Sequence, residues 1–77
     1  MGKPTRITNA IRTLRFAHGE MTQAQLAQRI GVTRQTIIAI EQGRYSPSLE
    51  MAFQIARVFQ VPLDEVFQYP DGQGEPL

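Results

Sequence analysis

Apolar residues recur three and four positions apart along most of this chain, which is the spacing of one face of a helix. Near the start, this pattern predicts a first helix with Ile11 and Leu14 on its inner face. Thr8 or Asn9 would cap that helix, because their side chains can accept from a free backbone N–H group. His18-Gly19 would end it.

The second half of the chain continues the helical pattern. A longer helix is expected to begin after Ser48, which suits a helix cap, and to run to about Phe59. Val61-Pro62 breaks that helix, and the proline can start the next one. A short last helix would then carry an apolar edge formed by Leu63, Val66 and Phe67. Those residues could complete the core of a single chain or form a contact between two chains.

Between these segments, the pattern predicts two short helices joined by a tight turn. Thr22 with Gln25 three residues later matches a capping box at the start of the first of the two helices. Gly31 fits a left-handed position at the end of that helix, where a side chain would be strained. Thr33 can then cap the second helix. So short a turn makes two amphipathic helices cross steeply, and the small side chain of Ala27 suits their crossing point.

The second of these helices is expected to turn a polar face outward. That face would carry Arg34, Gln35, Ile38, Ala39 and Gln42. Arginine can donate in a fork to guanine O6 and N7, and glutamine can pair with adenine N6 and N7. Arg34 and Gln35 lie in the first turn of the helix, the end that usually enters the major groove of DNA. The alternative is that both are simply solvated side chains.

At this point the chain resembles the helix-turn-helix of the Cro/phage-repressor type, also called the XRE type. The matching residues are Gln23, Leu26, Ala27, Gly31, Val32, Thr33, Ile37, Glu41 and Gly43, followed by Pro47-Ser48-Leu49, Ile55-Ala56 and Val61-Pro62-Leu63. The resemblance covers roughly Ile7 to Phe67. It implies an all-α fold, a compact lambda-repressor-like bundle of about five helices in which helices 2 and 3 form the helix-turn-helix. It also implies a sequence-specific DNA-binding transcriptional regulator, commonly a repressor.

The resemblance further implies a role for individual residues. Base edges would be contacted by Arg34 and Gln35, with Ala39 and Ile38 able to touch thymine methyl groups. Phosphates would be held by Gln23, Thr33, Gln42, Arg44, Ser46 and Ser48. Glu41 would pair with an arginine of the first helix, which by position is Arg15. This chain has one residue more than the common spacing between that helix and the next.

Composition limits the alternatives. A chain of 77 residues is enough for one small domain, and without cysteine it has neither disulfides nor thiolate metal sites. We find no nucleophile–base pairing and no glycine-rich phosphate loop, so we expect neither an enzyme nor a cofactor. No apolar run approaches the length of a membrane span, and the N-terminus has no apolar signal region, so a cytoplasmic protein is expected.

The distribution of charge supports a DNA partner more than the net charge of +1 does. Residues 1–44 contain seven Lys and Arg residues against two Asp and Glu residues. Residues 45–77 contain one against five. One basic and one acidic half suit a domain with a single DNA-facing side.

The expected organisation is a flexible N-terminal arm at residues 1–6, a DNA-binding domain at 7–69 and a flexible tail at 70–77. A domain this small buries little DNA surface, so we expect a homodimer through the C-terminal helices on a near-palindromic operator. A DNA-binding antitoxin or a restriction–modification controller could use the same module. A protein-interaction module of the same fold would tend to lose Gln23, Arg34 and Gln35, which this chain keeps.

Overall fold

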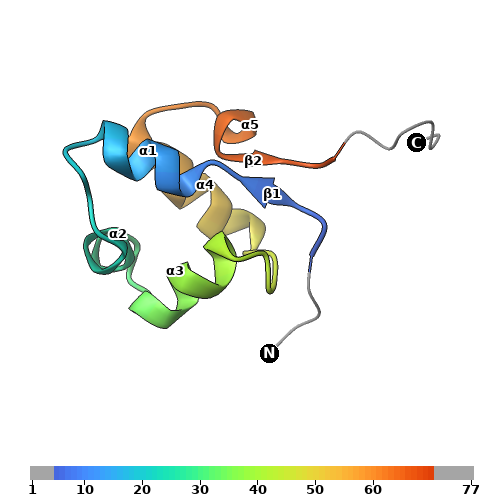
Figure 1. The fold of residues 1–77 in the computed structure, drawn as a ribbon, viewed down its shortest axis with the longest axis horizontal. Helices are drawn as coiled ribbons and strands as arrows, with labels where there is room; N and C mark the ends of the chain where they lie inside the picture. The colour runs from blue at the N-terminus through green and yellow to red at the C-terminus, as the bar shows by residue number, and fades with distance from the viewer. Residues whose placement is uncertain (1–4, 71–77) are drawn as a thin grey trace.

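Five helices and two very short strands follow one another in the computed structural model, which describes residues 5–70 (Figure 1). In chain order they are β1 (Thr8–Asn9), α1 (Ile11–Ala17), α2 (Gln23–Ile30), α3 (Arg34–Glu41), α4 (Leu49–Phe59), α5 (Leu63–Val66) and β2 (Phe67–Gln68). The expected bundle of about five helices is confirmed, with α2 and α3 as the pair joined by the tight turn. The two strands are an addition that helical periodicity did not predict.

Local signals in the sequence explain where α2 begins and ends. The Thr22 hydroxyl accepts from the backbone N–H of Gln25 at 3.0 Å, and the Gln25 side chain accepts from the N–H of Thr22 at 2.8 Å. This reciprocal pair is the predicted capping box. Gly31 ends the helix in the left-handed region, with φ of 77°. The chain can therefore turn sharply toward α3 without strain on a side chain.

The expected start of α1 needs correction. The cap position is Ala10, which has no side chain able to cap, while Thr8 lies in β1. Asn9 accepts from the N–H of Ile11 at 3.1 Å, and its amide donates to the carbonyl of Ile40 at 3.0 Å. Asn9 thus connects the start of α1 to the end of α3, which is a tertiary role that a local cap pattern does not reveal.

The two strands join the beginning and the end of the described chain. They pair antiparallel, with Thr8 opposite Gln68 and Asn9 opposite Phe67. The N–H of Ala10 continues the contact by donating to the carbonyl of Val66 at 2.8 Å. Figure 1 shows this pairing beside α5.

The core is formed by side chains from all five helices. Its largest fully buried members are Phe59, Ile11, Leu26, Ile37, Ile40, Ile55 and Val66. Ala27 is also buried and belongs to the same cluster, consistent with a close crossing of α2 and α3. Burial of these apolar side chains is the main stabilising contribution to the fold.

The C-terminal residues expected at a dimer surface divide into two kinds. Val66 is fully buried, so its expected part in a contact between chains is wrong: its side chain is already used inside the domain. Leu63 and Phe67 are half-buried against the core. The large apolar side chains that stay exposed on α4 are Leu49 and Phe53.

The expected arm and tail fall mostly on residues 1–4 and 71–77, which lie outside the described residues. At the edge of the arm, the N–H of Thr5 donates to the carbonyl of Gly43 at 3.1 Å. The described chain therefore starts next to the loop that follows α3. None of the helices in residues 5–70 has the length and apolar character that crossing a bilayer requires.

Candidate nucleic-acid interface

The first turn of α3 is exposed, as the sequence predicts. Arg34 and Gln35 open the helix, and both lie on the surface. Thr33 caps it by accepting from the N–H of Thr36 at 3.2 Å, and the two threonine hydroxyls lie 3.0 Å apart. The cap holds the helix end in place, so that the two long polar side chains project from a fixed backbone.

Farther along α3, the two expected apolar contacts differ. Ile38 is half-buried and keeps part of its side chain on the surface. Ala39 is only 1% exposed, so its expected outward placement, and with it a contact to a thymine methyl group, is wrong. The chain beyond Gly43 turns back over the end of the helix, where the N–H of Arg44 donates to the carbonyl of Ala39 at 3.0 Å.

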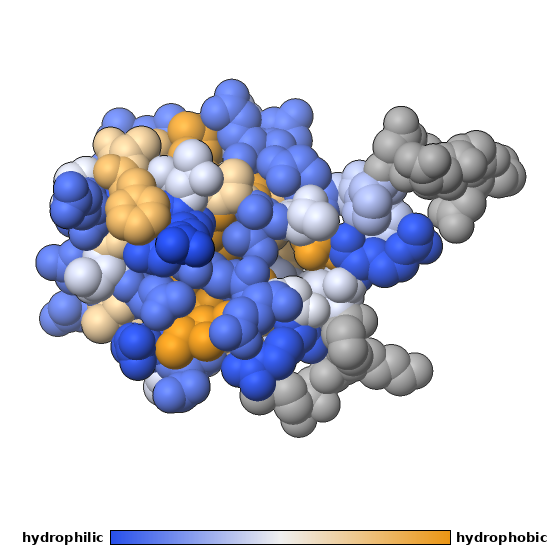
Figure 2. All heavy atoms as spheres, in the orientation of Figure 1, coloured by the Kyte–Doolittle hydropathy of each residue, from blue (hydrophilic) through white to orange (hydrophobic). Residues whose placement is uncertain are grey.

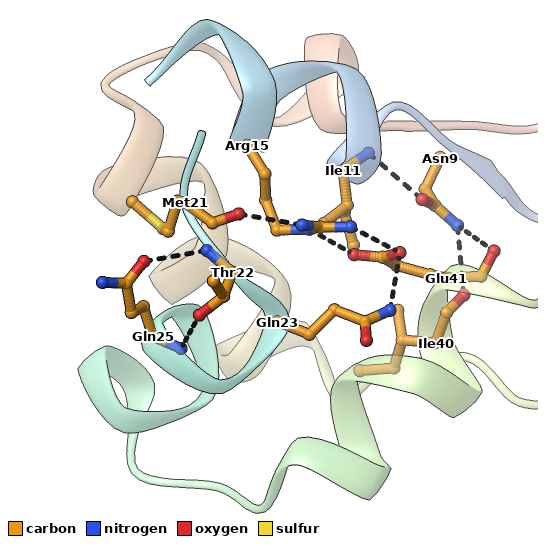
Figure 3. Close-up of polar contacts among 9 residues, drawn as sticks. All are labelled: Asn9, Ile11, Arg15, Met21, Thr22, Gln23, Gln25, Ile40 and Glu41. Carbon is orange, nitrogen blue, oxygen red and sulfur yellow. Dashed lines mark hydrogen bonds and ion pairs between the residues drawn. The ribbon is translucent and has the colours of Figure 1, made fainter. Parts of the chain in front are cut away.

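Three helices meet at the carboxylate of Glu41 (Figure 3). Arg15 from α1 donates to it twice, from Nε to Oε2 at 2.8 Å and from Nη2 to Oε1 at 3.2 Å. Gln23, the first residue of α2, donates from Nε2 to Oε1 at 3.2 Å. The Arg15 partner expected from the resemblance is therefore confirmed, despite the extra residue in the loop between α1 and α2.

This network also orients the start of α2. The third guanidinium nitrogen of Arg15, Nη1, donates to the carbonyl of Met21 at 2.8 Å, directly before the cap Thr22. Arg15 and Glu41 are both about 10% exposed along their side chains and compensate each other's charge. The network thus fixes α2 relative to α3 and leaves no uncompensated carboxylate at the junction.

An open depression of about 710 Å³ lies over this network. It is lined by Asn9, Arg12, Arg15, Phe16, Glu20, Met21, Thr22, Gln23, Ala24, Arg34, Glu41 and Gln42. Figure 2 shows that hydrophilic residues cover most of the face formed here by α1, α2 and α3, with small apolar areas among them. Polar and cationic side chains around an open depression can receive a large anionic surface rather than enclose a small molecule.

The residues expected to hold phosphates are only partly gathered at this depression. Gln23 and Gln42 line it, and Gln42 is exposed at the end of α3. Arg44 and Ser46 are exposed in the loop that follows. Ser48 caps α4 by accepting from the N–H of Met51 at 3.1 Å, so its oxygen already has a structural partner.

Several residues of the depression were not singled out by the sequence, among them two from the first helix. Arg12 and Phe16 come from α1 and line the depression beside Gln23 and Arg34. Their spacing of four positions on a helix was the available signal, because side chains at that spacing lie on one face. Nothing in the one-dimensional pattern places that face next to the start of α2.

Comparison with known proteins identifies relatives along most of the chain. A family profile described as helix-turn-helix matches residues 11–66. An uncharacterised HTH-type transcriptional regulator of Methanocaldococcus jannaschii is 48% identical over 65 residues, which cover 84% of this chain and 97% of the relative. The cryptic phage CTXphi transcriptional repressor RstR of Vibrio cholerae is 36% identical over 59 residues, covering 77% of this chain and 52% of that protein.

Solved structures share the fold. The restriction–modification controller protein C.AhdI of Aeromonas hydrophila superposes with a TM-score of 0.64 at 29% identity, over 71% of this chain and 78% of that one. A solved structure of a protein from Bacteroides fragilis gives a TM-score of 0.70 over 80% of this chain and 98% of that one, at 24% identity. The second likeness concerns the fold alone.

Proposed function

The chain belongs to the helix-turn-helix family of Cro/phage-repressor type, whose members are DNA-binding transcriptional regulators, and we propose that it reads operator DNA with α3. The observation that carries this proposal is the exposed first turn of α3, with Arg34 and Gln35 projecting from a capped helix end. The donor fork of Arg34 matches the two acceptors of guanine, O6 and N7, and the amide of Gln35 can both donate and accept at adenine N7 and N6.

Backbone contacts would come from the surroundings of this helix. Gln23 and Gln42 lie at the edge of the same depression, and Arg44 and Ser46 follow in the exposed loop. The hydroxyls of Thr33 and Ser48 accept backbone N–H groups at the starts of α3 and α4, and each could still donate its O–H to a phosphate oxygen. Such contacts position the protein on the duplex and carry no sequence information themselves.

We infer that the protein acts in the cytoplasm as a repressor and binds as a two-fold dimer. Support for repression comes from the likeness to the phage repressor. Support for the dimer comes from the small size of the domain, since a single module buries limited DNA surface. Leu63 and Phe67, with exposed faces near the end of the domain, remain the proposed contact, without Val66.

A restriction–modification controller is the second candidate, and the likeness to C.AhdI favours it. A controller and a repressor would read DNA in the same way and differ in the genes that they regulate. The regulated operator therefore separates them, because a controller's site would lie upstream of restriction and modification genes.

The experiment that tests DNA reading is selection of duplexes from a random library by the purified protein. We expect enrichment of one motif arranged as an inverted repeat, and loss of that enrichment with the double variant R34A/Q35A. The matched control is R57Q, which removes a cation from α4, away from the depression. Absence of any enriched motif with the parent protein would overturn the proposed function.

A further inference from the structure

We propose that Arg12 and Phe16 of α1 form an additional phosphate-binding element, a proposal that rests on the proposed DNA binding of the same face. The element would hold one DNA backbone phosphate beside those held from α2 and α3. It would extend the DNA-contacting surface to the first helix, which the resemblance leaves without a direct contact.

The two side chains are arranged as a cation over an aromatic ring. The guanidinium carbon of Arg12 lies 5.7 Å from the centre of the Phe16 ring, one helical turn farther along α1. Phe16 is 55% exposed and lines the depression, so its ring is accessible at the surface where Arg12 lies. A ring below the guanidinium restricts its orientation while leaving its N–H donors open to an anion.

The guanidinium of Arg12 is available to bind such an anion. Within residues 5–70, Arg12 forms no hydrogen bond or ion pair, and its contact is the ring of Phe16. The neighbouring Arg15 also lies over the Phe16 ring, at 5.9 Å, but each of its three guanidinium nitrogens already donates to Glu41 or to the carbonyl of Met21. Glu20 also lines the depression but forms no ion pair with Arg12 in the described part of the chain.

The position of Arg12 favours duplex DNA as the partner. It shares the depression with Gln23, Arg34 and Gln42, three residues that the proposed function places on DNA. A duplex whose major groove receives α3 must carry a phosphate strand past the rim of that groove. Arg12 stands on the α1 side of the depression, where its planar fork of donors suits the oxygens of a phosphate.

Salt dependence of DNA binding tests the element directly. Each neutralised phosphate adds about 0.9 to the slope of log K against log salt concentration. For R12Q we expect the slope to fall by about 0.9 per bound chain, with affinity reduced about tenfold for selected and unrelated duplexes alike. The control R57Q removes an equal charge beside Arg29, in a separate hollow of about 320 Å³, and should keep the parental slope.

The ring is tested by variants that keep the charge. F16L should weaken binding by about threefold with the slope nearly unchanged, because the cation remains but is less ordered. The same change in an R12Q background should have no effect on affinity. R12K should retain the slope, since a lysine still displaces a counterion.

The outcomes separate this proposal from the proposed function. If the parent protein binds no duplex, the DNA-binding function fails and this element with it. If the parent binds its selected operator and R12Q gives the same slope and affinity as R57Q, the element alone is wrong. An equal effect of F16L with and without Arg12 would also overturn the proposed arrangement of ring and guanidinium.

Discussion

Arg15 on α1 and Glu41 on α3 are joined by two hydrogen bonds, of 2.8 and 3.2 Å, across 26 positions of sequence. The same carboxylate accepts from Gln23 at the start of α2. One ion pair thus sets the relative positions of the three helices around the depression. Its main contribution is geometric, because burying two charges offsets much of their attraction.

Replacing only one partner of this ion pair should lower the free energy of unfolding. R15M leaves the Glu41 carboxylate largely buried without its cation, so we expect the free energy of unfolding to fall by about 3 kcal/mol. The double variant R15M/E41L should recover much of that loss, since two apolar side chains leave no charge unpaired. Denaturant unfolding of the parent and the single and double variants measures both effects. A double variant as unstable as the sum of the singles would contradict the coupling.

Substitutions of the residues proposed to contact bases should change DNA binding differently from substitutions of the residues proposed to contact phosphates. Arg34→Ala or Gln35→Ala should relax the preference at one operator position, at about 1–3 kcal/mol of discrimination each. Arg44→Ala should weaken binding to all sequences similarly and reduce the salt slope. Affinities for an operator and its single-base variants, measured at two salt concentrations, check both statements. Unchanged affinity and preference for Gln35→Ala would exclude the proposed docking of α3.

The turn between α2 and α3 should tolerate little change. Gly31 has φ of 77°, and a Cβ there would meet no atom within 4 Å, so the cost of Gly31→Val comes from the backbone and should be about 1–3 kcal/mol. Ala27→Leu should cost a similar ~1–3 kcal/mol because the buried crossing is already filled. Gly31→Asn serves as the control, since asparagine tolerates this region better. Thermal melts showing either Gly31→Val or Ala27→Leu as stable as the parent would reject this account.

Gln60 is a position where substitution by glycine should raise the stability of the protein. It ends α4 with φ of 57°, a left-handed position where a side chain is disfavoured. Gln60→Gly should therefore stabilise the protein by about 0.5–1 kcal/mol. Gln54→Gly, at an exposed position inside α4, should instead destabilise it by roughly 0.5–1 kcal/mol. Chemical unfolding distinguishes the two, and a destabilised Gln60→Gly variant would be the contrary result.

Dimer formation is tested by the mass of the complex with a selected operator. We expect two chains per operator, with half-site centres about 34 Å apart along the duplex. Phe67→Glu should impair assembly on DNA, and circular dichroism must show that the half-buried position tolerates the change. Phe53→Glu on the exposed part of α4 is the matched control. One chain per operator, with no repeat in the selected sequences, would refute the dimer and leave DNA reading intact.

Local chemistry allowed much of the helix-turn-helix to be predicted from the amino-acid sequence. The bond between Thr22 and Gln25 spans three positions, and the left-handed turn at Gly31 depends on the residue itself. Such interactions require no distant partner, so spacing and residue type are sufficient. The exposed placement of Arg34 and Gln35 follows from the same helical periodicity.

The sequence by itself determined the helices, most of their caps and the tight turn, because these depend on neighbours along the chain. Tertiary structure alone decided that Ala39 and Val66 are buried and that Thr8 pairs with Gln68. It also placed Arg12 and Phe16 beside the start of α2. Each of these outcomes depends on which surfaces meet when the helices pack, and a helical period describes one face without stating what covers it.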